Sequence, residues 1–340
     1  MELGKRKEAI LSAVIESYIR TGEPVGSKVL VAALENAVSS ATIRNEMAEL
    51  SAMGYLEQPH TSAGRIPTAR AFRLYIDKLM PRRLVENERR QIIANRLERA
   101  AGDPERLLSE ASHILSETTG CAALATPPSE SAETLRRIEY MRMSARTVMI
   151  AVMTSSGTLR SRLCRMDASV DDEQLAALFT LLVDRFVGRP LAEIALPELQ
   201  QLLFTPGVGG LATAGLITGF FDLVNECVEA DVRLTGQLNL LGKPDYQLDH
   251  ARLLLGFLSQ PERIAAMLSA YTDGLQVLLG SESLCPELSG SSVIVTRYSP
   301  DGQQYGTIGL IGPVRMDYAS AIPQIEYMAR TVEQLMAELW

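Results

Sequence analysis

A run of small polar side chains near residue 40 has the chemistry needed to contact nucleic acid. The polar residues are Ser39, Ser40, Thr42, Arg44 and Asn45. Their hydroxyl, guanidinium and amide groups suit phosphates and the edges of bases. Ile43, Met47 and Leu50 recur at helical spacing and can pack the opposite face of the same helix into a core. The pattern predicts a recognition helix whose first turns enter the major groove.

Two helices must precede this segment if it is part of a helix-turn-helix. Apolar residues recur every three or four positions from Ile10 to Tyr18, which predicts a first amphipathic helix. The pattern breaks at Gly22 and Pro24. Ser27 is placed to cap a second, short helix. The spacing therefore predicts three consecutive helices, with the polar run on the third.

The residues after the third helix are typical of a wing. Gly54 is suited to the left-handed conformation that ends a helix. Residues 55–58 and 66–68 are candidates for two short strands, and the polar loop 59–65 joins them. The first domain, residues 1–80, is therefore predicted to be a winged helix-turn-helix.

Long motifs at both ends of the chain point to a known family. Pro24-Val25-Gly26-Ser27-Lys28, the run from Ser39 to Leu50 and the run from Gly54 to Thr68 lie near the N-terminus, and Gly309 to Tyr318 lies near the C-terminus. In this order they resemble the HrcA family of heat-inducible transcription repressors over the whole chain, with a less specific middle. At Ala71-Phe72-Arg73 the family more often has Gly-Tyr-Arg, and no functional consequence is expected.

The winged-helix pattern and the resemblance together predict where DNA binds. The predicted contact residues are Ser27, Lys28, Ser39, Ser40, Thr42, Arg44, Asn45, His60, Thr61, Ser62, Gly64 and Arg65. The wing hydroxyls and Arg65 should meet phosphate or the minor groove, with Gly64 allowing a backbone conformation unfavourable to other residues. Two alternatives stay open: a plain solvent contact for His60, and a helix phase that turns Thr42 and Glu46 toward the groove.

The charge of the chain is unevenly distributed. Residues 1–83 carry 12 Lys and Arg against 9 Asp and Glu, whereas the remainder carries 21 against 32. The net charge of −8 therefore does not exclude DNA binding, because the basic part coincides with the predicted winged helix.

Beyond residue 80 the chain has the pattern of a multidomain α+β protein. Residues 81–119 are predicted to be a helical linker, and strand-like segments then appear on both sides of a helical middle. The strand candidates are 121–125, 138–141, 148–152, 159–166, 275–279, 293–298 and 305–311. This arrangement predicts one α+β domain interrupted by an insertion. The resemblance implies a GAF-like domain, placed at 120–340, with an inserted dimerising segment placed near 190–272.

Other classes of protein find little support in the sequence. Four scattered cysteines and three isolated histidines give no metal-ligand spacing, disulfide framework or catalytic cluster, so no metal, cofactor or enzymatic activity is expected. Glycine and proline interrupt the uncharged stretch 199–221, which argues against a membrane span. The N-terminal residues do not have the apolar pattern of a secretion signal, so a cytoplasmic location is expected. The alternating methionines are expected to be core residues: Met141, Met143, Met149, Met153 and Met166.

The resemblance implies a homodimeric repressor of chaperone operons. It would occupy an inverted-repeat operator in double-stranded DNA, depend on a chaperonin partner for its active form, and lose activity on heat stress. One alternative is a metabolite-responsive winged-helix regulator that uses the GAF-like domain as a ligand sensor. Another is a winged-helix protein-interaction module without DNA activity.

Overall fold

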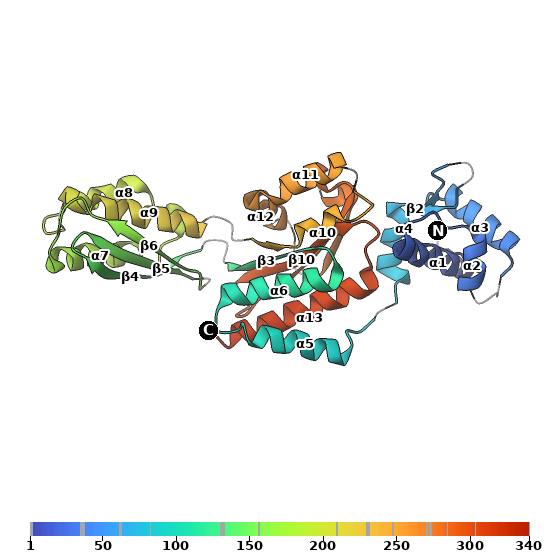
Figure 1. Cartoon of the computed structure of the whole chain (residues 1–340), viewed down its shortest axis with the longest axis horizontal. Coiled ribbons are helices and arrows are strands. Elements are labelled where there is room, and N and C mark those ends of the chain that lie inside the picture. Colours follow the sequence, from blue (N-terminus) through green and yellow to red (C-terminus); the bar gives the residue numbers. More distant parts are fainter. Residues whose placement is uncertain are drawn as a thin grey trace.

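A computed structural model describes all residues except 1–2, 35–37, 61–62, 82, 130–132, 156, 209, 229–231, 247, 270, 272–273, 284, 303 and 340. The described residues form three units in a row, with the N-terminal unit at one end (Figure 1). The predicted multidomain α+β class is confirmed.

The N-terminal unit is a winged helix, as predicted. Its elements are α1 (Lys5–Thr21), α2 (Ser27–Ala33), α3 (Ser40–Ala52), β1 (Leu56–Glu57), β2 (Ile66–Pro67), α4 (Ala69–Leu74) and a π-helical turn, η1 (Tyr75–Leu79). The periodic apolar residues of α1 and α3 are buried in one core. Gly54 has φ 78°, and the Tyr55 N–H donates to the Leu50 carbonyl across it, so the predicted left-handed helix end is confirmed.

The central unit is built on an antiparallel sheet of five strands in the order β7-β3-β10-β9-β8. The strands are β3 (Ala122–Ser129), β7 (Arg233–Thr235), β8 (Gln276–Leu279), β9 (Ser291–Tyr298) and β10 (Tyr305–Pro313). The helices are α5 (Asn87–Glu98), α6 (Pro104–Thr119), α10 (Gln237–Leu241), α11 (Leu248–Leu258), α12 (Pro261–Ser269) and α13 (Tyr318–Ala337), with 3-10 turns η5 (Gly280–Ser283) and η6 (Pro286–Leu288). These elements form an α+β unit, as predicted for the residues beyond the helical linker.

Side-chain alternation along β3 separates the two faces of this sheet. Ala123 and Ala125 pack into the cluster that contains α6 and α13, whereas Ala122 and Leu124 pack into the cluster that contains α11 and α12. The predicted linker 81–119 is helical, but α6 is not merely a connection. Its apolar face, including Leu108 and Leu115, belongs to the central core.

The third unit is a separate lobe between β3 and β7. It contains β4 (Leu135–Ser144), β5 (Thr147–Thr154), β6 (Leu159–Arg165), α7 (Asp172–Phe186), α8 (Leu196–Gln201) and α9 (Ala214–Val228), with 3-10 turns η2 (Leu191–Glu193), η3 (Leu202–Phe204) and η4 (Gly210–Thr213). These strands form their own sheet, β4-β5-β6, and share a hydrophobic core with α7–α9.

The lobe therefore differs from the insertion predicted at 190–272. It covers 133–228, because the strands 135–165 pair within it among the described residues. The second half of the predicted segment, from β7 through α12, packs on the central sheet instead. Periodicity indicates a strand but does not indicate which sheet the strand joins.

The prediction that the alternating methionines are core residues is wrong for two of them. Met166 is buried and Met149 and Met153 are half-buried, but Met141 and Met143 are 56% and 55% exposed. Their face of the sheet points away from α7 and α9. No helix among the described residues is long and apolar enough to cross a membrane.

Candidate nucleic-acid interface

The predicted recognition helix, α3, buries and exposes the residues that its sequence pattern predicts. Ser39 caps it, with the Thr42 N–H donating to Ser39 Oγ at 3.2 Å. Ile43, Met47 and Leu50 are buried, whereas Arg44 and Asn45 are exposed. The guanidinium and amide groups are therefore free to reach a ligand outside the fold.

Glu46 is directed toward α1. Its carboxylate lies 2.8 Å from Lys7 Nζ, which is also 2.9 Å from Glu49. The hydrogen bonds that Lys7 donates to the carboxylates of Glu46 and Glu49 raise its pKa. The alternative phase, with Glu46 toward the groove, would break these pairs and add a negative charge beside phosphates, so the arrangement favours Arg44 and Asn45.

Four hydroxyl groups gather where α2 and α3 begin. Ser27 Oγ lies 3.0 Å from Ser40 Oγ, and Ser39 Oγ lies 2.9 Å from Thr42 Oγ1. Lys28 is exposed in the first turn of α2. Hydroxyls, a cation and the positive ends of two helix dipoles make this corner suitable for a phosphate.

The wing is fastened to the start of α2. β1 pairs with β2 through Leu56↔Pro67 and Glu57↔Ile66, and an isolated bridge joins Val25 to Arg65. In that bridge the Val25 N–H donates to the Arg65 carbonyl at 2.8 Å, and the Arg65 N–H donates to the Val25 carbonyl at 2.9 Å. The wing strands therefore have a fixed position relative to the helix-turn-helix.

Gly64 is needed for a reason that the sequence did not indicate. Its φ lies outside the left-handed region, so the prediction of an unfavourable backbone conformation is wrong. A Cβ at this position would lie 2.5 Å from the carbonyl carbon and oxygen of Val25 and 2.8 Å from the carbonyl carbon of Pro24. The absence of a side chain is what allows the two backbones to approach.

The guanidinium of Arg65 is held within the wing. Arg65 Nη1 donates to Gln58 Oε1 at 2.8 Å, and Gln58 Nε2 donates to the Ala63 carbonyl at 3.0 Å. His60 is exposed, in keeping with either of its interpretations. Thr61 and Ser62 lie outside the described residues.

The wing is also joined to α4 by residues that were not predicted as part of the site. Thr68 caps α4 and its hydroxyl donates to the Gly54 carbonyl at 2.8 Å. Arg70 donates to the Met53 carbonyl at 3.0 Å and lies over the Tyr55 ring, 4.7 Å from its centre. A threonine at the start of a helix signals a cap, but no local pattern predicts the contacts of Arg70.

Two family models match most of the chain. The family "Winged helix-turn-helix transcription repressor, HrcA DNA-binding" matches residues 2–78, and "HrcA protein C terminal domain" matches residues 105–322. The chain belongs to the HrcA family. Proteins described as "Heat-inducible transcription repressor HrcA" from Moorella thermoacetica and Desulforudis audaxviator are 33% and 30% identical, in each case over 100% of both chains. A crystal structure of a hypothetical protein has the same fold, with 22% identity and a TM-score of 0.70 over 100% of both chains.

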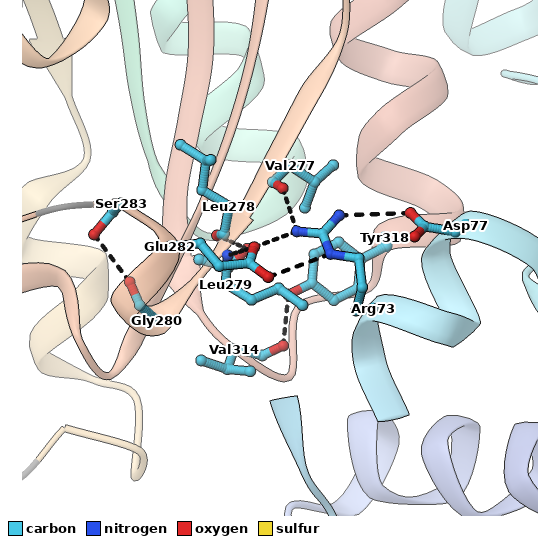
Figure 2. A network of polar contacts seen from close by, with 11 residues as sticks. Arg73, Asp77, Val277, Leu278, Leu279, Gly280, Glu282, Ser283, Val314 and Tyr318 are labelled. Carbon is cyan, nitrogen blue, oxygen red and sulfur yellow. Dashed lines mark hydrogen bonds and ion pairs between the residues drawn. The ribbon is translucent and has the colours of Figure 1, made fainter. Parts of the chain in front are cut away.

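In this HrcA-family chain the winged helix is docked on the central unit by polar contacts. Arg73 on α4 forms an ion pair with Glu282 and donates from Nη2 to the Val277 carbonyl at 2.6 Å. Figure 2 shows Arg73 between these groups and Asp77, which lies 3.5 Å from Nη1. On the other side of the junction Arg315 donates to Asp245 at 2.5 Å and to the Ile19 carbonyl at 3.1 Å.

The C-terminal motif supplies part of this junction. Arg315 and Tyr318 both lie in the run from Gly309 to Tyr318, and the ring of Tyr318 packs 6.2 Å from that of Phe72 on α4. The motif that resembles the family at one end of the chain therefore contacts the domain that carries the motifs at the other end. Sequence reasoning predicted neither contact, because the partners are about 245 residues or more apart.

Proposed function

We propose that this protein represses heat-shock genes by binding an inverted-repeat operator upstream of chaperone operons, and that it acts by binding DNA rather than by catalysing a reaction. The observation that carries the proposal is α3, which buries Ile43, Met47 and Leu50 while presenting Arg44 and Asn45 outward. The names of the full-length relatives supply the heat response.

The proposed DNA contact extends over three neighbouring surfaces. Arg44 and Asn45 would read base edges, and the hydroxyls with Lys28 would hold phosphate. Arg65 would reach phosphate or minor groove by leaving Gln58, since both partners of that hydrogen bond are accessible to solvent. His60, Thr61, Ser62 and Gly64 complete the proposed wing contact.

We propose that the outer face of the β4-β5-β6 sheet is the surface through which two copies pair. Three cross-strand pairs on it are apolar, with Met149 opposite both Met141 and Leu163, and Met153 opposite Leu159. Met141, Leu159 and Leu163 are each more than half exposed. An apolar sheet face of this kind is costly to leave in water and is suited to a symmetric dimer. Two joined winged helices would then match the two halves of an inverted repeat.

The same face supports the proposed chaperonin partner. A chain that has not yet paired exposes these methionines and leucines, and exposed apolar surface is what a chaperonin can hold. Heat would divert chaperonin to other clients and leave more repressor unpaired. This scheme places the protein in the cytoplasm, where operator and chaperonin are both available.

The test is binding to DNA upstream of chaperone operons, measured by fluorescence anisotropy and footprinting with the full chain. Arg44→Ala and Asn45→Ala should each weaken operator binding by about 1–3 kcal/mol without changing thermal unfolding. Lys78→Ala is the matched control, because Lys78 is an exposed cation of the same domain outside the proposed interface. Unchanged affinity in both α3 variants would contradict the assignment.

The wing is tested by salt dependence. Arg65→Ala should weaken binding to specific and non-specific DNA alike. The slope of log affinity against log salt should fall in magnitude by about one if Arg65 neutralises one phosphate. Lys78→Ala again serves as the charge-matched control. An unaltered slope for Arg65→Ala would mean that its guanidinium stays on Gln58.

A further inference from the structure

A cleft of about 650 Å³ lies where the winged helix meets the central unit. Its walls come from α4 and η1, from residues 80 and 83–85 before α5, and from α5, β8 and α13. In Figure 1 this connection runs from α4 past α13 to α5. The volume is within the range that holds small organic ligands.

Three arginines that line the cleft have no carboxylate partner within 4.0 Å among the described residues. They are Arg83, Arg90 and Arg330. Arg90 is the most constrained, because its Nε is buried and has no hydrogen-bond acceptor. Its guanidinium lies 5.6 Å from the centre of the Tyr327 ring, while the Tyr327 hydroxyl donates to the Arg90 carbonyl at 3.2 Å. A buried donor without an acceptor costs free energy that a bound anion would recover.

The carboxylates of the cleft do not neutralise these cations. Asp77 lies 3.5 Å from Arg73, which also lines the cleft and forms an ion pair with Glu282. Glu326 is the other carboxylate of the lining, and its backbone carbonyl accepts from Arg330 Nε at 3.2 Å. The lining therefore contains four arginines and two carboxylates, and Glu282 from outside it pairs with only one of these arginines, Arg73. The local field favours a negatively charged ligand.

Part of the remaining lining is apolar. Leu275 and Val277 contribute from the β8 side, Ile322 from α13 and Met80 from the winged-helix side. A fully hydrated inorganic anion would gain nothing from these groups, whereas a ligand with an apolar body would bury them.

We propose that this cleft binds a small organic anion, with a phosphate or carboxylate held by Arg83, Arg90 and Arg330 and an aromatic or branched apolar body against Ile322 and Val277. Because the walls belong to both the winged helix with its connection and the central unit, such a ligand binds most tightly when the two are docked. It therefore shifts the population toward the docked arrangement.

The experiment is calorimetric titration of the full chain with phenyl phosphate, with inorganic phosphate and benzyl alcohol as separate arms. It uses no DNA and so is independent of the proposed operator binding. Phenyl phosphate should bind saturably and about tenfold more tightly than either simpler probe, because only it satisfies both the cations and the apolar wall. Arg90→Gln and Arg330→Gln should each weaken it about tenfold or more.

Two further variants keep the test sharp. Arg99→Gln is the matched control, since Arg99 is exposed at the end of α5 and outside the cleft lining, and it should bind as the parent does. Arg90→Lys keeps the charge but loses the planar fork, and should bind between the parent and Arg90→Gln. The proposal is overturned if no probe binds saturably, if phenyl phosphate binds no better than inorganic phosphate, or if the Arg90 and Arg330 variants bind as the parent does.

Discussion

Replacing Gly64 by alanine tests how the wing is held to the helix-turn-helix. The added Cβ would lie 2.5 Å from the carbonyl carbon and oxygen of Val25, and these backbone atoms cannot move aside as a flexible side chain would. The least costly response is for the wing to separate from residue 25. That movement breaks the two backbone hydrogen bonds, of 2.8 and 2.9 Å, between Val25 and Arg65.

The cost follows from these contacts. Overpacking a closely packed site costs about 1–3 kcal/mol. Each lost backbone hydrogen bond adds about 1 kcal/mol, less what the freed groups recover from water. We therefore expect local destabilisation of about 2–4 kcal/mol. At the lower limit, and where closing is faster than exchange, this corresponds to a roughly thirtyfold faster exchange of the Val25 and Arg65 amides.

Hydrogen exchange of the full chain, followed by mass spectrometry, measures this opening directly. Gly26→Ala is the control, because a Cβ there meets no atom within 4 Å, although loss of a helix-capping glycine costs up to about 1 kcal/mol. The Gly64→Ala variant should lose protection in segments 24–31 and 56–68, and its operator affinity should fall. If both variants exchange alike, the close approach at Gly64 does not hold the wing.

Three other outcomes are expected. Met141→Glu combined with Leu163→Glu should convert the proposed dimer to a monomer in sedimentation, because it places two carboxylates on the outer face of the β4-β5-β6 sheet. Lys78→Glu adds a carboxylate away from that face and should leave the dimer intact; a double variant that stays dimeric would exclude this face as the interface. A 100–340 fragment should stay dimeric without binding DNA, and a 1–80 fragment should bind one half-site weakly; a monomeric 100–340 fragment would place the interface in the winged helices. Arg73→Ala should widen the distribution of domain orientations in small-angle scattering relative to Lys78→Ala, and identical curves would contradict a role in docking.

The winged helix could be predicted from the sequence because its signals are local. A periodic stripe places Ile43, Met47 and Leu50 inside, and the cap at Ser39 and the left-handed Gly54 mark the ends of α3. The apolar stripe, the cap and the terminal glycine each depend on residues within a few positions of one another, so the local sequence is enough to predict them. Arg44 and Asn45 are exposed for the same reason.

Predictions that needed partners distant in the sequence were less accurate. The strands 135–165 have the same alternation whether they join the central sheet or form their own, so the lobe limits could not be read from periodicity. Alternation also places Met141 and Met149 on one face of the sheet, but it does not indicate whether helices cover that face. The role of Gly64 depends on the approach of Val25, which is 39 positions away and does not alter the local pattern.

The C-terminal motif has a physical explanation in the junction that it forms. Arg315 connects the end of α1, through the Ile19 carbonyl, to Asp245 on the central unit, and both side chains of this pair are less than one-fifth exposed. An arginine so placed cannot be replaced by lysine without losing one of two divergent donors. Gly22 adds a constraint, because a Cβ there would lie 3.1 Å from the Arg315 guanidinium carbon. The orientation of the winged helix, on which the proposed contact with two half-sites depends, is thus specified by residues at opposite ends of the chain.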